Sequence, residues 1–136
     1  MAAAVADFRP VRHADHKLER GASLTLELEP TTDVLAEVAR TVGTPRPVLV
    51  GFAAETGSLD RAADKLRRKG VDLLVANDVA EPGSGFGTDT NRVSILAADG
   101  SRDDLPLQSK RDVADAILDR VAAALDARHD AGQTGT

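Results

Sequence analysis

Continuous apolar stretches alternate along this chain with stretches in which apolar residues recur every three or four positions. Residues 47–52 and, with one exception, residues 71–76 are apolar throughout, which is typical of strands covered on both faces. Residues 92–97 predict a further strand, and the turn sequence Asp99-Gly100 follows it. Strands that alternate with helices in this way predict an α/β fold with a partly parallel sheet.

Three segments carry the helical spacing. The first begins after residues 30–33, where Thr or Asp can cap a helix, and it ends at Gly43. The second runs from about residue 59 to 69 and stops at Gly70. The third is long, has Ser109 as its cap and carries a continuous apolar stripe.

The N-terminal part is more polar. Residues 2–6 are typical of the end of a small-residue strand whose start is cut off, so we expect the chain to be a fragment of a longer domain. Residues 7–21 predict a loop, and residues 22–28 alternate between apolar and polar side chains as a half-exposed strand does. Residues 1–128 are expected to form the ordered domain, and residues 129–136 a disordered tail.

Composition narrows the range of functions. The chain has 136 residues, enough for one domain with a core, and its apolar runs are far below the roughly 20 residues of a membrane span. We also expect no signal peptide. A net charge of −5 and only three aromatic residues disfavour a nucleic-acid partner. The absence of cysteine excludes disulfides and thiolate chemistry and fits a reducing, cytoplasmic compartment.

The most informative chemistry lies where the first buried strand ends. Gly51, Ala53 and Ala54 remove side-chain bulk there, so a ligand can approach the backbone closely. Ligands of open α/β sheets bind at this carboxyl edge. Lys65 and Lys69 follow four residues apart on one face of the next helix. Two converging ammonium groups predict a site for a polyanion such as a nucleoside triphosphate.

Other charged residues leave alternatives open. Asp7 can hold a ribose hydroxyl or a phosphate-bound magnesium ion, or it can simply cap a turn. Lys17 lies in a charged cluster on a predicted mobile loop, where it closes over a phosphate or is only solvated. The basic run 65–69 also complements a helix dipole. The glycine-rich stretch 83–89 leads into a strand rather than a helix, so it is not a dinucleotide motif.

Taken in order, these segments resemble the phosphopantothenate–cysteine ligase family from Ala3 to about Leu125. In many bacteria this ligase is the C-terminal half of a bifunctional coenzyme A biosynthesis protein, whose other half is a flavin-dependent phosphopantothenoylcysteine decarboxylase. The resemblance implies a Rossmann-like, mostly parallel sheet with flanking helices and a small antiparallel dimerisation element, present here as an incomplete domain. Its markers are residues 3–10, Lys17, residues 32–35 and 51–56, Lys65, Lys69, residues 77–79, Gly85, Phe86, Asp89 and Asn91.

The resemblance also implies a reaction. In such bacterial enzymes the carboxylate of 4′-phosphopantothenate attacks the α-phosphate of CTP, which is bound with Mg²⁺. Pyrophosphate leaves and an acyl-cytidylate forms. The amine of L-cysteine then attacks this mixed anhydride, giving 4′-phosphopantothenoylcysteine and CMP. FMN is expected only in the decarboxylase half, which this chain lacks.

Individual residues receive roles from the same resemblance. Lys17 matches a catalytic lysine on a mobile flap, and Asp7 matches a nucleotide-binding aspartate that reaches Mg²⁺ through the triphosphate. Residues 22–28 fall in a dimerisation region, which implies a homodimer. The implied CTP-binding residues are Ala6, Asp7, Phe8, Lys17, Thr31, Thr32, Asp33, Val34, Phe52, Lys65 and Lys69.

The chain departs from the family in two places. Glu19 and Arg20 replace lysines of the flap, and the family's first, glycine-rich segment with an Asn-Ser-Ser-Gly stretch is missing. The missing segment puts activity of the chain by itself in question. Two alternatives remain open: a nucleotide-binding module without ligase chemistry, and a dimerising half-domain. A Rossmann-type oxidoreductase is disfavoured because no Gly-x-Gly-x-x-Gly follows a strand.

Overall fold

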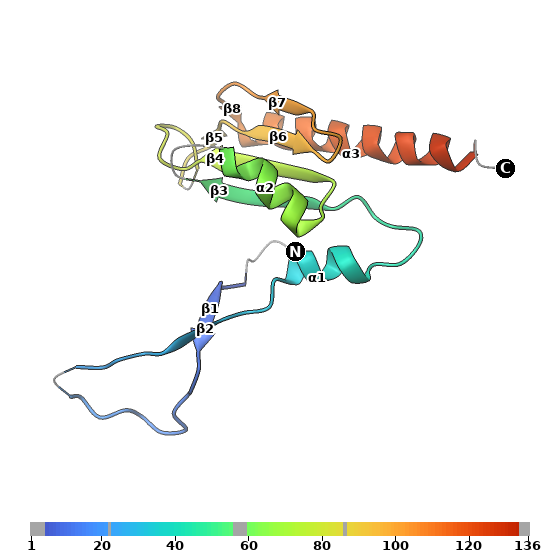
Figure 1. The fold of residues 1–136 in the computed structure, drawn as a ribbon. Helices are drawn as coiled ribbons and strands as arrows, with labels where there is room; N and C mark the ends of the chain where they lie inside the picture. Colours follow the sequence, from blue (N-terminus) through green and yellow to red (C-terminus); the bar gives the residue numbers. More distant parts are fainter. Residues whose placement is uncertain (1–4, 22, 56–59, 86, 134–136) are drawn as a thin grey trace.

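The computed structural model describes residues 5–21, 23–55, 60–85 and 87–133. Figure 1 shows a body, in which helices lie around a sheet, and a thin arm that extends away from the body. The sheet of the body has four strands, and the arm comprises residues 8–30. The elements follow in the order β1 (Phe8–Pro10), β2 (Leu28–Pro30), α1 (Val34–Thr41), β3 (Val50–Glu55), α2 (Asp60–Lys69), β4 (Leu73–Asp78), β5 (Thr90–Asn91), β6 (Ser94–Ala97), β7 (Arg102–Asp104), β8 (Gln108–Ser109) and α3 (Lys110–Gln133).

The main sheet confirms the α/β class and is more antiparallel than the sequence suggested. Its strand order is β3-β4-β6-β7, with β3 and β4 parallel and the other two pairs antiparallel. A parallel pair needs a long crossover, which α2 supplies between β3 and β4. The described residues between β4 and β6 contain no helix, so β6 returns antiparallel. The turn at Gly100, whose φ is +89°, then joins β6 to β7.

Two apolar layers explain the continuous apolar sequences of the central strands. Alternate residues of β4 point to opposite faces of the sheet, and helices cover both faces (Figure 1). The layer under α2 contains Ala53, Ala62, Leu66, Val71, Leu74, Ala76 and Leu96. The layer under α3 contains Leu73, Val75, Val93, Ile95 and Val113.

The helix boundaries follow the local signals in the sequence. The Asp33 side chain caps α1 by accepting a hydrogen bond from the backbone N–H of Ala36 at 3.2 Å. Gly70 ends α2 with φ at +64°, a conformation that glycine adopts without strain. The Ser109 hydroxyl accepts a bond from the N–H of Asp112 at 3.1 Å at the start of α3.

The end of β3 differs from the prediction. The strand was expected to end near residue 52, but Ala53 and Ala54 continue it to Glu55. The reason is the parallel ladder with β4, in which Ala53 lies opposite Ala76 and Ala54 opposite Asn77. Pairing with a buried neighbour outweighs the weak strand propensity of alanine.

The arm contains the largest errors of the sequence analysis. The predicted strand over 22–28 is wrong for residues 23–27, which form no strand, while Leu28 belongs to β2. β1 lies instead in the stretch predicted as a loop, where Phe8 pairs with Pro30 and Pro10 with Leu28. Residues 5 and 6 are not in a strand, and the rest of the predicted N-terminal strand lies outside the described residues.

The last helix is longer than expected. α3 continues to Gln133, so the prediction of a disordered tail is wrong over residues 129–133, and residues 134–136 lie outside the described part. Arg128 bonds to the body through the Asp72 carboxylate and the Arg46 carbonyl, which anchors the final turns. None of the described helices is long and apolar enough to cross a membrane.

Candidate functional site

A cavity of about 610 Å³ lies beside β3, where α1, α2 and the base of the arm meet. We call it the β3 cleft. It draws on segments that are far apart in the sequence, because the arm leads into α1 and α1 lies next to α2 (Figure 1). Its lining residues are Val5, Asp7, Phe8, Thr31, Thr32, Asp33, Val34, Leu35, Phe52, Ala53, Ala54, Lys65, Arg68, Lys69 and Leu74.

All of the predicted nucleotide-binding residues except Ala6 and Lys17 line this cleft. Ala6 is adjacent to it, since its carbonyl oxygen accepts a hydrogen bond from the Thr31 hydroxyl at 2.5 Å. Lys17 is exposed, lies between β1 and β2, and does not line the cleft. The arm to which it belongs extends away from the body (Figure 1). The arm joins the body only at its base, so nothing in the described chain folds its outer loop back.

The two lysines of α2 are each held by a carboxylate. Lys65 Nζ lies 2.5 Å from Glu55 Oε1, and Lys69 Nζ lies 2.7 Å from Asp33 Oδ2. Glu55 is buried at the end of β3, whereas the other three side chains remain partly open to solvent. The two pairs orient the ammonium groups. The Lys69–Asp33 pair is partly exposed on both sides and is therefore weak, so Lys69 can exchange its carboxylate for a phosphate ligand at small cost.

Asp33 has two structural roles at the cleft. The Lys69 ammonium, its strongest partner, and the N–H of Ala36 hold the pKa of this carboxyl below its ordinary value, against a smaller opposing effect of burial. The same side chain marks the N-terminus of α1, and Thr31 and Thr32 precede it in the cleft wall. A helix N-terminus presents free N–H groups and a positive dipole end, which favours an anionic ligand.

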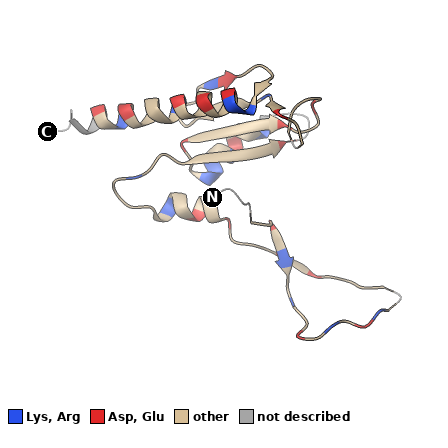
Figure 2. Ribbon diagram, turned by 180° about the vertical axis from the view of Figure 1, so that it is seen from behind, with Lys and Arg blue, Asp and Glu red and all other residues tan. Residues whose placement is uncertain are grey.

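Basic residues are concentrated at the C-terminal end of α2, the end next to α1. Figure 2 shows Lys and Arg concentrated at that end of α2, while α3 carries both signs along its length. Arg68 lines the cleft together with Lys65 and Lys69. The sequence analysis treated Arg68 only as part of a basic run. Its position three residues after Lys65 could have indicated it, because helix residues three or four apart lie on the same face.

Phe52 adds a flat apolar surface to these charges. Its side chain is 73% exposed although it lies within a strand. The exposure arises because α3 covers β4 and β6, whereas β3 is the edge strand and its α3 side is largely uncovered. An exposed aromatic ring beside cationic groups suits a ligand that combines a stacking base with phosphates.

The cleft contains no set of protein ligands for a metal ion. In the described part of the chain, no group of three or more His, Cys, Asp or Glu side chains is placed to hold one. Two carboxylates line the cleft: Asp33 is already bonded to Lys69 and to the N–H of Ala36, and Asp7 is the other. This arrangement fits Mg²⁺ bound mainly through phosphate oxygens and water, as is usual for nucleotide complexes, with one protein carboxylate nearby.

A second cavity of about 460 Å³ lies near β6 and β7, and its charges largely satisfy one another. Arg92 Nε lies 2.7 Å from Glu81 Oε1, and Arg102 Nε lies 2.8 Å from Asp104 Oδ1. Hydrogen bonds from Ser94 and then Arg102 hold the pKa of the Asp104 carboxyl below its ordinary value. The β3 cleft, with its excess of donors, is therefore the stronger candidate for an anionic ligand.

The fold and the cleft together define an α/β protein with a cationic, aromatic-edged cleft beside the edge strand of its sheet. Residues 1–125 match the family described as the DNA/pantothenate metabolism flavoprotein C-terminal domain. The chain belongs to this family, which confirms the resemblance at family level.

Known relatives agree with this assignment. The chain is 47% identical over 123 residues to the coenzyme A biosynthesis bifunctional protein CoaBC of Bacillus subtilis (strain 168), which covers 89% of this chain and 30% of that protein. It is 39% identical over 123 residues to a cysteine/cysteine sulfinic acid decarboxylase of an unknown prokaryotic organism, covering 89% of the chain and 34% of that protein. The chain thus spans about a third of the length of these relatives.

One solved structure supports the fold. The crystal structure of the C-terminal domain of the coenzyme A biosynthesis bifunctional protein CoaBC superposes with a TM-score of 0.62 at 40% sequence identity. The superposition covers 74% of this chain and 48% of that domain.

Proposed function

We propose that this chain is the C-terminal part of a CTP-dependent phosphopantothenate–cysteine ligase that acts in coenzyme A biosynthesis in the cytoplasm. The observation that carries the proposal is the β3 cleft, in which an exposed aromatic ring, three basic side chains and a helix N-terminus surround one space. The relatives named CoaBC support the pathway, and the resemblance of the sequence supports the ligase half.

In this proposal, different residues of the cleft bind the triphosphate, the base and the ribose of the nucleotide. Lys65, Arg68 and Lys69 neutralise the triphosphate, and the N-terminus of α1 donates N–H groups to it. Phe52 contacts the base, while backbone groups of Ala6 and Phe8 read its edge. Asp7 serves the ribose or the phosphate-bound Mg²⁺. Bound Mg²⁺ supplies charge neutralisation, and the side chains of this chain orient the phosphates.

The proposed reaction depends more on electrostatic stabilisation by the protein than on covalent catalysis. The carboxylate of 4′-phosphopantothenate attacks the α-phosphate of CTP, pyrophosphate leaves, and the acyl-cytidylate then reacts with the amine of L-cysteine to release CMP. The cleft cations hold two anions close together, which their mutual repulsion would otherwise oppose. Lys17 would reach the reacting centre only when the arm moves or when a second subunit supplies it.

A homodimer through the arm is part of the proposal. Leu24, Leu26 and Leu28 are all more than half exposed, and they contact no core of the described chain. Three exposed leucines at alternate positions of one short segment suit an interaction surface. The decarboxylase half with its FMN lies in a part of the protein that this chain does not contain, and nothing in the β3 cleft is proposed to bind a flavin.

The first test is calorimetric titration of the chain with CTP and with ATP, each in the presence of Mg²⁺. We expect saturable binding that prefers CTP. Binding of neither nucleotide would contradict the assignment of the cleft, and a clear preference for ATP would contradict the CTP-dependent reaction. A titration with CMP serves as a control, because loss of two phosphates should remove most of the contribution of the basic side chains.

The catalytic step needs a separate test. In a chimera, residues 1–125 of this chain replace the matching segment of the Bacillus subtilis relative. We expect release of pyrophosphate from CTP that depends on 4′-phosphopantothenate, and product formation when L-cysteine is added. A chimera that binds CTP but releases no pyrophosphate would instead favour a nucleotide-binding module without ligase chemistry.

A further inference from the structure

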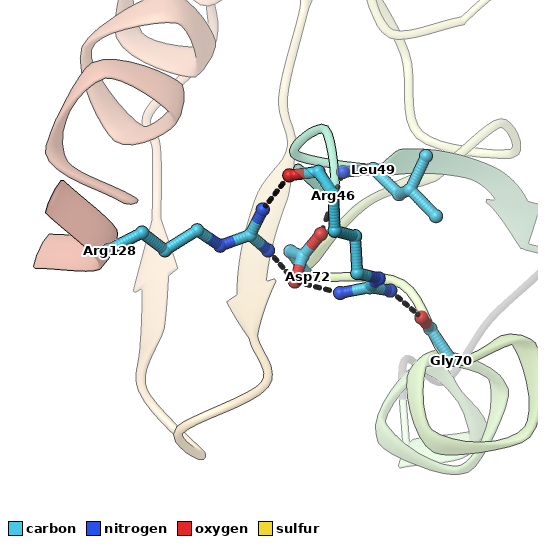
Figure 3. Close-up of polar contacts among 5 residues, drawn as sticks. All are labelled: Arg46, Leu49, Gly70, Asp72 and Arg128. Atoms are coloured by element: carbon cyan, nitrogen blue, oxygen red, sulfur yellow. Dashed lines mark hydrogen bonds and ion pairs between the residues drawn. The ribbon is translucent and has the colours of Figure 1, made fainter. Parts of the chain in front are cut away.

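A polar cluster lies at the end of the sheet opposite the carboxyl edge, between α3 and the starts of β3 and β4. Figure 3 shows the Asp72 carboxylate at its centre, between two guanidinium groups. Arg46 Nη1 lies 2.9 Å from Asp72 Oδ1, and Arg128 Nη2 lies 2.5 Å from the same oxygen. Asp72 Oδ2 accepts a hydrogen bond of 2.7 Å from the backbone N–H of Leu49. Arg128 Nη1 also donates to the carbonyl oxygen of Arg46 at 2.8 Å.

The side chains of the cluster are largely shielded from solvent although all three are charged. The Asp72 side chain is 16% exposed, and the two arginine side chains are about one-third exposed. Burial would raise the pKa of the Asp72 carboxyl, but the Leu49 N–H and the charges of Arg128 and Arg46 outweigh it and lower this pKa. Charge-assisted bonds that share one carboxylate restrain all of their donors, because moving one group leaves a charge unpaired.

A series of hydrogen bonds, ion pairs and packing contacts leads from this cluster to the wall of the β3 cleft. Arg46 Nη2 donates to the carbonyl oxygen of Gly70 at 2.7 Å (Figure 3). Gly70 ends α2 directly after Lys69, whose ammonium pairs with Asp33 at the N-terminus of α1. Gly70 also lies against α1, since a Cβ atom at this position would stand 3.5 Å from the Cβ of Ala39.

Few other contacts fix α1. It has no buried residue, and Leu35 is its only side chain that packs against the apolar layer under α2 as far as the described residues show. Arg46 belongs to the segment that connects α1 to β3, so the cluster holds the exit of α1 and the end of α2 at once. Both helices supply walls of the cleft.

We propose that Arg128, Arg46 and Asp72 are positioning residues for the nucleotide site, acting through Gly70 and Lys69 to set the distance between α1 and α2. The proposal rests on the proposed function of the cleft. If Arg128 has this role, the last turns of α3 influence the affinity for the triphosphate although they do not contact the ligand. The cluster touches no substrate, and its effect is transmitted by the hydrogen bonds described above.

The test compares two arginines of the same helix. Arg128→Ala removes the link to Asp72, whereas Arg120→Ala removes an ion pair with Asp103 of β7, which includes neither Asp72 nor a residue of α2. We expect Arg128→Ala to weaken Mg²⁺·CTP binding roughly threefold to thirtyfold, the range of couplings carried through packed networks. Arg120→Ala should leave the affinity unchanged. Thermal unfolding of each variant shows that the comparison is made on folded protein.

A readout that needs no nucleotide is the titration of the Asp33 carboxyl, followed by carbon-13 NMR. Loss of the Lys69 contact should move the pKa of Asp33 up towards its ordinary value in Arg128→Ala and not in Arg120→Ala. Arg128→Lys keeps the charge but cannot donate to both acceptors as the guanidinium fork does, so it should restore only part of both effects.

A double substitution separates positioning from simple loss of stability. If Arg128 acts through Lys69, adding Arg128→Ala to Lys69→Ala should weaken CTP binding little further, whereas independent effects would multiply. The proposal is overturned if the two losses multiply, or if folded Arg128→Ala matches Arg120→Ala in both readouts. If the unaltered chain binds no nucleotide, the proposed function fails, and the Asp33 titration still decides the positioning role.

Discussion

Leucine side chains are buried in the body of the molecule and exposed in its arm. Leu73 and Leu74 are nearly inaccessible in β4, whereas Leu24 and Leu26 are more than half exposed in the arm. Both segments are rich in aliphatic residues. The difference is that β4 has a strand on each side and a helix on each face, while residues 23–27 have neither. A leucine pattern therefore specifies a strand only where partners exist to cover it.

The β3 cleft lies where these two regions meet. Asp7 and Phe8 come from the base of the arm, and Lys65 and Lys69 come from the body. The body orients the cations, and the base of the arm forms the other side of the cleft. Substitutions in the body, in the cleft and in the arm measure the difference between the two regions.

The largest effect is expected in the apolar layer under α2. Leu74→Ala should lower the free energy of unfolding by about 3–4 kcal/mol, because a side chain that is 2% exposed leaves a cavity. Urea denaturation measures the change. Leu24→Ala is the matched control in the arm. A loss of similar size for both substitutions would contradict the distinction between body and arm.

Asp72→Asn should lower the free energy of unfolding by about 2–3 kcal/mol at neutral pH, since it leaves two sheltered guanidinium groups without a carboxylate. The folded pKa of Asp72 lies below that of the unfolded chain, so its contribution is fully present above about pH 4 and disappears as the pH falls through the folded value.

The pH dependence of the free energy of unfolding provides a check on the role of Asp72. Urea denaturation between pH 7 and pH 3 should show a smaller loss of stability in Asp72→Asn than in the unaltered chain. An equal dependence on pH in both proteins would show that Asp72 contributes no acid-sensitive stability.

Lys65→Ala should weaken Mg²⁺·CTP binding roughly tenfold, or about 1.5 kcal/mol, because it removes one charged donor from the cleft. Arg67→Ala is the matched control, since Arg67 lies on the same helix, pairs with Asp64 and does not line the cleft. Titration calorimetry measures both. Equal affinities of the two variants would remove Lys65 from the site.

The smallest effect on stability is expected in the arm. Leu24→Ser combined with Leu26→Ser should change the free energy of unfolding of the dilute chain by less than about 0.5 kcal/mol, because both side chains are already exposed. The same pair should reduce self-association, which sedimentation equilibrium measures at high protein concentration. A strictly monomeric unaltered chain would contradict the proposed dimer.

The helix boundaries and most of the cleft residues could be predicted from local patterns in the sequence. Asp33, Gly70 and Ser109 lie at helix ends where their side chains or backbone freedom have a direct use, so these boundaries were predictable. The cleft residues were predicted partly because Lys65 and Lys69 share a helix face and partly from the family resemblance. Their gathering in one cavity depends on the strand–helix order, which the sequence also indicates.

The remaining features depend on residues that are far apart in the sequence. The end of β3 is set by its register with β4, and the base of the arm by pairing between β1 and β2. Arg128 meets Asp72 across 56 positions, and no local pattern marks either residue. Glu55 was missed because its importance arises only when α2 folds back and places Lys65 beside it.

The Arg46–Asp72–Arg128 cluster has a consequence for how the protein is made. Chains fold from the N-terminus while they are being synthesised. A nascent chain that has not yet exposed Arg128 lacks one of the two guanidinium groups that hold Asp72. The strands and the lysines of α2 emerge from the ribosome earlier. If the cluster positions α1 and α2 as proposed, a chain synthesised only as far as α2 would hold nucleotide weakly, and the site would be complete once Arg128 has emerged.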